Sequence, residues 1–171
     1  MFAFGFFLAS IVLGVNVVLA SPTMFPEVVP GPGLPSLESL GLTSKELWAM
    51  KPKSFNSSLE ARSANFDNRC FTYSTADVGN TIACFNYLVA IGDQTCTVSG
   101  HTRLLCNVGD AAIEGVNLKP DVGPTSSSCF EAALAVQWIF TYCNVNGRVG
   151  GLAQVDENPN FVVGVYSIND V

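Results

Sequence analysis

The chain contains a single histidine, which narrows the catalytic chemistry available to its side chains. His101 follows Ser99 and Gly100, a pair typical of a hairpin turn, so we expect its imidazole to lie in solvent. The alternative is a general base assisted by Arg103 and a carboxylate, but the sequence identifies no partner placed for proton transfer. One histidine also excludes the two-histidine zinc motif of metalloproteases, and no serine lies in a G-x-S-x-G motif. We therefore predict no enzymatic activity, no catalytic residue, no metal and no cofactor.

Polar oxygen atoms and tyrosine rings are the remaining groups that suit ligand binding. Asp156, Asn158 and Asn160 follow one another closely and are able to bind sugar hydroxyls or a cation, although the same pattern is typical of an ordinary turn. Tyrosine rings stack on sugars, and those that lie outside the apolar helical segment are Tyr73, Tyr87 and Tyr166. We predict five glycan contacts: Tyr73, Asp156, Asn158, Asn160 and Tyr166. The carboxylates of the cysteine-containing region are otherwise interpreted as solvated charges rather than a glycosidase pair: Asp110, Glu114, Asp121, Asp156 and Glu157.

Six cysteines predict covalent cross-links. All of them lie between residues 70 and 143, and no two are as close as the C-x-x-C pairs typical of zinc sites. An even number within a short stretch of an exported chain predicts three disulfides, whose pairing the sequence leaves open. The cysteines are Cys70, Cys84, Cys96, Cys106, Cys129 and Cys143.

The N-terminal 20 residues resemble a cleaved leader. Residues 1–20 carry no charged side chain and are almost wholly apolar, and small residues ending at Ala20 precede Ser21 and Pro22. No lysine or arginine follows until Lys45, so a stop-transfer flank is missing. An uncleaved anchor is the alternative, because the leader has no basic residue at its start. We predict a signal peptide over 1–20, secretion, and no stable membrane anchor.

The charge pattern argues against nucleic acid as a partner. Charged residues make up 13 % of the chain, the net charge is −6, and the eight basic residues are scattered. A nucleic-acid interface or an anionic membrane surface needs clustered basic side chains. The sequence leaves the oligomeric state open.

A proline-rich stretch precedes the cysteines and predicts a linker or a propeptide over 21–65. A short helix is possible over 43–50, ended by Pro52, but it has few partners for a core. Asn56 begins an N-glycosylation sequon, and Arg62 is a possible cleavage point. The prolines that favour extended chain are Pro22, Pro26, Pro30, Pro32 and Pro35.

The globular domain is expected over 66–171, with two helices among several strands. A helix is predicted from a cap at Asn80 or Thr81 to Ile91, and a second over 128–142, where Ser128 and Glu131 form a capping box. The aromatic residues of the second helix, Trp138, Phe140 and Tyr142, are assigned to the core. Strands are predicted over 69–73, 94–98, 101–106, 111–117, 148–155 and 161–167.

The order of these elements predicts an α+β fold: a small disulfide-stapled α/β sandwich in which a mostly antiparallel sheet is packed by two helices. Cys129 and Cys143 lie at opposite ends of the second helix, about 21 Å apart along its axis. They cannot bond to each other, so we expect each to attach one helix end to another element.

The cysteine rhythm from about Asn68 to Ser167 resembles small secreted mushroom (basidiomycete) lectins of the ink-cap type. The resemblance implies a compact α/β/α-like sandwich, disulfides and a glycan or glycoprotein ligand. Fungal killer toxins and plant-directed effectors are more loosely similar, and they supply the alternative function. Members of the lectin type often end in a further cysteine, which this chain lacks. The segments that carry the resemblance are Arg69-Cys-Phe71, Ala83-Cys84, Leu104-Leu-Cys106, 111–117, Ser128-Cys-Phe-Glu-Ala-Ala-Leu134, Tyr142-Cys143 and Gly150-Gly151.

Overall fold

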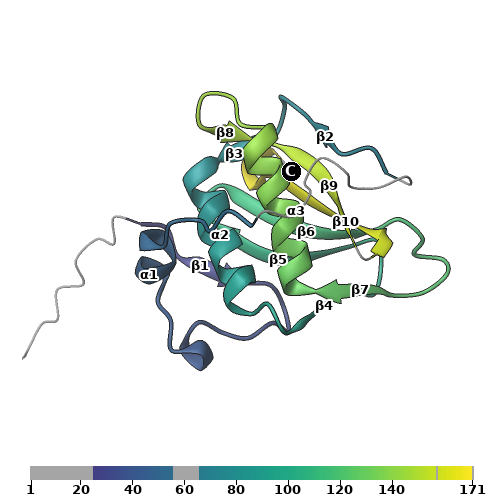
Figure 1. Ribbon diagram of the computed structural model, residues 1–171, viewed down its shortest axis with the longest axis horizontal. Coiled ribbons are helices and arrows are strands. Elements are labelled where there is room, and N and C mark those ends of the chain that lie inside the picture. The colour runs from purple at the N-terminus through teal and green to yellow at the C-terminus, as the bar shows by residue number, and fades with distance from the viewer. Residues whose placement is uncertain (1–24, 56–65, 157, 171) are drawn as a thin grey trace, which may run out of the picture.

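The computed structural model describes residues 25–55, 66–156 and 158–170 (Figure 1). The predicted signal peptide over 1–20, and the predicted sequon at Asn56, lie outside these residues. Within them, no helix combines the length and the apolar character that a membrane crossing requires.

A six-stranded sheet forms the centre of the molecule, and every neighbouring pair in it is antiparallel. Two further strand pairs flank it: β3 (Ala76–Asp77) with β8 (Arg148–Val149), and β4 (Thr95–Val98) with β7 (Thr125–Ser128). In spatial order the main sheet contains β1 (Val28–Pro30), β5 (Thr102–Val108), β6 (Ala111–Asn117), β10 (Asn158–Ser167), β9 (Gly151–Val155) and β2 (Arg69–Cys70).

Two long helices, α2 (Val78–Ala90) and α3 (Cys129–Tyr142), lie side by side against one face of this sheet (Figure 1). The Ser128 hydroxyl accepts a hydrogen bond from the Glu131 amide, so the predicted cap of α3 is confirmed. The predicted cap of α2 is wrong, because the Asp77 carboxylate accepts from the Asn80 amide and the helix begins three residues earlier than expected. Short helices are α1 (Ser44–Ala49), η1 (Glu38–Leu40) and η2 (Ile168–Asp170).

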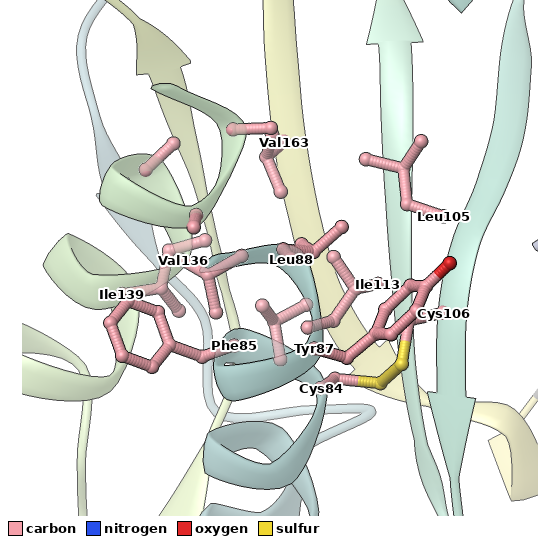
Figure 2. Packing of buried hydrophobic residues seen from close by; sticks show 14 of the residues in the cluster. Cys84, Phe85, Tyr87, Leu88, Leu105, Cys106, Ile113, Val136, Ile139 and Val163 are labelled. Carbon is pink, nitrogen blue, oxygen red and sulfur yellow. A yellow bond between two sulfur atoms is a disulfide. The ribbon is translucent and has the colours of Figure 1, made fainter. Parts of the chain in front are cut away.

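The core lies between the helices and the sheet. Figure 2 shows Phe85 leaving α2 toward α3, and Tyr87 leaving it toward β5. Tyr87 is fully buried, which corrects its interpretation as a candidate for ligand stacking. The burial raises the pKa of Tyr87 to about 12, and its hydroxyl donates a hydrogen bond to the Pro35 carbonyl at 2.8 Å. The tyrosine ring therefore fills the core, while its hydroxyl is hydrogen-bonded to the backbone at Pro35.

Three disulfides join elements that are distant in sequence. Cys84 of α2 bonds to Cys106 of β5, as Figure 2 shows, and Cys96 of β4 bonds to Cys129 at the start of α3. Cys70 of β2 bonds to Cys143, directly after α3. The expectation that both ends of the second helix are attached to other elements is confirmed. The protein is a small disulfide-stapled α+β domain with a mostly antiparallel sheet.

Residues 25–55 are packed onto this domain, which differs from the linker expected there. β1 pairs with β5 at the edge of the main sheet, a position that tolerates Pro30 because its missing amide faces no ladder partner. The predicted short helix is present as α1, whose Thr43 and Glu46 form a complete capping box. The side chain of Leu47 on α1 is fully buried. Apolar residues between the prolines pack this segment onto the domain. Removal of the segment as a propeptide stays a prediction.

Two loop expectations also need correction. Ser99 and Gly100 do not form a hairpin turn, because β4 pairs with β7 whereas β5 pairs with β1 and β6. The strand expected over 148–155 is interrupted at Gly150, where a β-carbon would lie 2.8 Å from the Phe71 ring. Three short strands, β1, β3 and β7, were not predicted from the sequence. Each pairs with a strand that is distant along the chain.

Candidate functional site

The face of the main sheet turned away from α2 and α3 carries a hollow of about 260 Å³, which we call the sheet-face hollow. Asn107, Ala112 and Tyr166 stand in register across β5, β6 and β10 and form its floor. A bulge in β5 between Leu104 and Cys106 shifts the alternation of side chains, so Leu104 and Asn107 share this face. The residues that line the hollow are Leu104, Asn107, Ala112, Glu114, Tyr166 and Ile168.

Tyr166 and Glu114 form the polar centre of the sheet-face hollow. The Tyr166 hydroxyl is hydrogen-bonded to the Glu114 carboxylate, and Tyr166 is half-buried. Burial, together with this carboxylate, raises the pKa of Tyr166 well above its ordinary value. The hydroxyl therefore stays protonated and donates to Glu114, which holds the ring in one orientation across the hollow.

Asn107 lines the same hollow, and its side-chain oxygen is unpaired within the described part of the chain. Its Oδ1 atom is buried and has no hydrogen-bond partner among the described residues. A buried acceptor left unpaired costs about 1–3 kcal/mol. The hollow thus combines an aromatic ring, a carboxylate and a side-chain amide with apolar walls. Groups of this kind recognise sugar rings and other small polyhydroxylated molecules.

A second hollow, of about 220 Å³, lies where the loop after β6 meets the start of β10. We call it the asparagine hollow. The predicted contacts Asn158 and Asn160 line it, together with Asn117, Lys119 and Ser126. Asn158 is already occupied: its Nδ2 donates to Thr125 Oγ1 and to the Ser126 carbonyl, and its Oδ1 accepts from the Asn160 amide. Asn158 therefore connects β7 to β10, which is a structural task.

Asn117 has a similar structural task in the same hollow. Its buried side chain donates from Nδ2 to the Gly123 carbonyl at 2.8 Å, and its Oδ1 accepts from the Lys119 amide at 3.0 Å. These bonds shape the loop that walls the hollow. Since both asparagines are committed to the backbone, the asparagine hollow offers a ligand fewer free polar groups than its composition indicates.

The other two predicted contacts lie apart from these hollows. Tyr73 is 74 % exposed, with its ring stacked on Phe71 at a centroid distance of 4.9 Å. Asp156 is exposed and lines neither hollow. The structure therefore brings together only Asn158 and Asn160 among the five predicted contacts. Glu114 and Asn107 were missed as contacts, because the bulge in β5 that places Asn107 beside Tyr166 has no sequence signal.

Several assignments of aromatic and charged residues change. Tyr142 is 49 % exposed at the end of α3, whereas Trp138 and Phe140 are partly buried against the core, as expected. Glu114 and Asp110, expected as solvated charges, are partly buried and hydrogen-bonded.

The expected general-base alternative at His101 gains no partner from the structure. His101 is exposed, and the guanidinium of the nearby Arg103 donates to the carbonyls of Thr97 and Pro32. Arg103 therefore stabilises the loop rather than a reacting group. Across residues 25–55, 66–156 and 158–170, no three histidine, cysteine, aspartate or glutamate side chains gather closely enough to hold a metal ion.

Residues 64–167 match the model of a protein family described as a domain of unknown function, DUF8794. The match spans the main-sheet strands from β2 onward, both long helices and all six cysteines, and it begins after residues 25–55. Searches of curated proteins and of solved structures found no match to this chain.

Proposed function

The chain belongs to the DUF8794 family, whose description names no activity, and we propose from its own residues that the protein is a secreted glycan-binding protein without catalytic activity. The sugar binds in the sheet-face hollow. The observation that carries this proposal is the grouping of Tyr166, Glu114 and Asn107 around one concave, partly apolar surface.

The chemistry of the hollow suits a sugar ring. The apolar C–H face of a pyranose packs on the Tyr166 ring, whose face is slightly negative. Its hydroxyls donate to the Glu114 carboxylate, and the side-chain amide of Asn107 lines the same hollow. Leu104 and Ile168 exclude water from the rim. Binding of this kind needs no reacting group, in keeping with a non-catalytic protein.

Secretion is supported by the covalent chemistry of the domain. All six cysteines form disulfides, which persist in oxidising compartments and are rare in the cytosol of most cells. The apolar leader over 1–20 supplies the export signal. Mass spectrometry of the protein from culture medium is expected to show an N-terminus at Ser21, no free thiol, and glycan on Asn56. Intact residues 1–20 or free thiols would contradict this part of the proposal.

A glycan array probed with the full secreted chain tests the binding function. We expect a defined group of sugars to bind, and the best of them to be measured by calorimetry against variants. Tyr166→Ala removes the stacking surface and is expected to weaken binding at least tenfold. Glu114→Gln and Asn107→Ala are expected to weaken it several-fold, because each changes a polar side chain that lines the hollow.

Tyr142→Ala is the matched control. Tyr142 is an exposed tyrosine on α3, on the helical side of the sheet, and its loss is expected to leave sugar affinity unchanged. Thermal unfolding of every variant separates lost binding from lost folding. A lack of binding to every fungal, plant and animal glycan on the array would overturn the proposal. Growth inhibition or leaf necrosis that no sugar competes with would favour the toxin or effector alternative instead.

A further inference from the structure

Buried side chains of the domain bind the backbone of residues 25–55, which we call the N-terminal segment. Asn86 Nδ2 donates to the carbonyls of Leu47 at 2.8 Å and Met50 at 3.0 Å. The Tyr87 hydroxyl donates to the Pro35 carbonyl at 2.8 Å, and Gln137 Nε2 donates to the Lys53 carbonyl at 3.1 Å. Asn86, Tyr87 and Gln137 are 6 %, 0 % and 4 % exposed, respectively. In each, a buried side-chain donor is paired with a carbonyl of the segment, although Gln137 Oε1 has no hydrogen-bond partner among the described residues.

The sheet edge binds the same segment in a second way. β1 pairs with β5 in antiparallel register from Val28 opposite Val108 to Pro30 opposite Cys106. The Gly31 amide then donates to the Leu105 carbonyl at 2.8 Å. The segment therefore adds a strand to a sheet edge, which is a recurring mode of peptide recognition.

Apolar anchors complete the contact. Val28 and Leu47 are buried against the domain, with exposures of 1 % and 0 %. The Phe55 ring meets Phe130 of α3 edge-on at 4.9 Å and lies 6.4 Å from Phe85 of α2. Together, the paired strand, the buried leucine and the aromatic cluster form a continuous contact that runs from the β5 edge across α2 to α3.

No covalent bond other than the chain itself joins this segment to the domain. All three disulfides lie between Cys70 and Cys143, and the family match begins at residue 64. The contact therefore resembles one between a domain and a peptide. Side chains of the domain donate hydrogen bonds to backbone carbonyls of the segment, and one paired strand and one buried leucine anchor it.

We propose that the surface formed by the β5 edge, by Phe85, Asn86 and Tyr87 of α2, and by Phe130 and Gln137 of α3 is a polypeptide-binding groove. Residues 25–55 occupy it as an intramolecular ligand. The ligand class is a main chain that extends along β5 and then presents carbonyl groups and a leucine to α2. This site adjoins the sheet-face hollow through β5, because Val29 of the segment pairs with Asn107, but residues 25–55 do not line that hollow.

The test uses the full chain with a protease recognition sequence, flanked by glycines, inserted between residues 60 and 61. After cleavage, native mass spectrometry is expected to show both fragments in one particle. A fluorescent synthetic peptide of residues 25–55 is then added in excess, and polarisation is expected to show its exchange into the cut protein. Chain connection only raises the local concentration of the segment, so cutting it leaves the contacts themselves intact.

Peptide variants keep the domain unchanged and so isolate the contacts. Leu47→Ala in the peptide removes the buried anchor and is expected to weaken binding at least tenfold. Gly31→Ala places a β-carbon 2.0 Å from the Leu104 carbonyl oxygen and is expected to weaken it similarly. Lys45→Ala is the matched control, because Lys45 is exposed on α1 and its loss should leave affinity unchanged.

Three results would overturn the proposal. The first is loss of the N-terminal fragment after cleavage without rebinding of the labelled peptide. The second is unfolding of the domain when the fragment leaves, seen as loss of near-UV circular dichroism, which would make the segment part of an indivisible core. The third is equal affinity of the parent and Leu47→Ala peptides.

Discussion

At the scale of single residues, the Asp110 carboxylate connects three parts of the domain. It lies in the turn between β5 and β6 and accepts from the Asp77 amide at 3.1 Å, from Asn80 Nδ2 at 2.7 Å and from Arg148 Nη1 at 2.6 Å. Burial alone would raise the pKa of Asp110, but the bonds from Asn80, from the Asp77 amide and from Arg148 outweigh it, and the pKa is lowered. The start of α2, the β5–β6 turn and β8 are held together by one ionised group.

This cluster predicts a pH dependence of stability. Because the folded pKa of Asp110 lies below its unfolded value, the stabilisation is complete above the unfolded pKa, near 4, and is lost as the pH falls through the folded pKa. We expect Asp110→Asn to lower the free energy of unfolding by about 1 kcal/mol at pH 7, a small value because Arg148 is largely exposed.

Urea unfolding at pH 7, 5 and 3 measures this effect. The difference between wild type and Asp110→Asn is expected to be constant from pH 7 to pH 5 and to shrink toward pH 3. Asp121→Asn, at an exposed loop position, is the control. A difference that grows on acidification would show that the sign of the pKa shift is wrong.

Residue types predicted the candidate site only in part. Tyr166 was identified because tyrosines suit sugars, but its partners Glu114 and Asn107 reach it through strand pairing and a bulge between Leu104 and Cys106. Asn158 was identified for its oxygen, yet its amide is used to connect two strands. Spacing along the chain reveals which atoms are present; it does not reveal which of them tertiary contacts already occupy.

At the scale of elements, the three disulfides differ in how far water reaches them. Cys84, Cys106, Cys96 and Cys129 are 0 % exposed, whereas Cys70 lies exposed on the edge strand β2. Thiol–disulfide exchange requires a thiolate to reach a sulfur atom, so access controls its rate. The Cys70–Cys143 bond is therefore the one open to attack in the folded protein.

Mild reduction is expected to open the disulfides in that order. In the folded protein at neutral pH, a low concentration of reductant should open Cys70–Cys143 before either of the buried bonds. Alkylation followed by peptide mass spectrometry identifies the modified cysteines at each time. The same treatment in denaturant is the control, because there all three bonds are equally accessible. Early labelling of Cys84 or Cys129 in the native protein would contradict the prediction.

Elements with strong local signals were predicted well. β6 was expected over 111–117 and is found there, and α3 was expected over 128–142 because Ser128 and Glu131 mark its start. The two-residue strand β3 was not expected, since two residues carry no periodicity, whereas β8 falls within the strand expected over 148–155. β1 was missed because its prolines favour an extended linker, and only the free edge of β5 turns that extended chain into a strand.

At the scale of the whole molecule, the two faces of the main sheet have different roles. One face holds the core under α2 and α3 (Figure 1). The opposite face carries the sheet-face hollow. The N-terminal segment covers the β5 edge and α2 without entering that hollow. The two sites meet at β5, whose Asn107 lines the hollow and pairs with Val29 of the segment.

The N-terminal segment is also expected to contribute to overall stability. Leu47→Ala in the full chain removes a fully buried side chain and should lower the free energy of unfolding by about 3 kcal/mol, within the range for leucine truncation in cores. Chemical denaturation measures the change, and Lys45→Ala on the same helix is the control. A change below about 0.5 kcal/mol, as for ordinary surface substitutions, would show that α1 does not support the folded state.

The confinement of all disulfides to the stretch from Cys70 to Cys143 has a mechanical consequence. A pulling force on the N-terminus meets only hydrogen bonds and packed side chains until it reaches the first cross-link. The roughly 45 residues between Phe25 and Cys70 then extend to about 150 Å before sulfur bridges carry the load. In a molecule held by its amino end and pulled by flow, the N-terminal residues would therefore extend, while the cross-linked part stays folded.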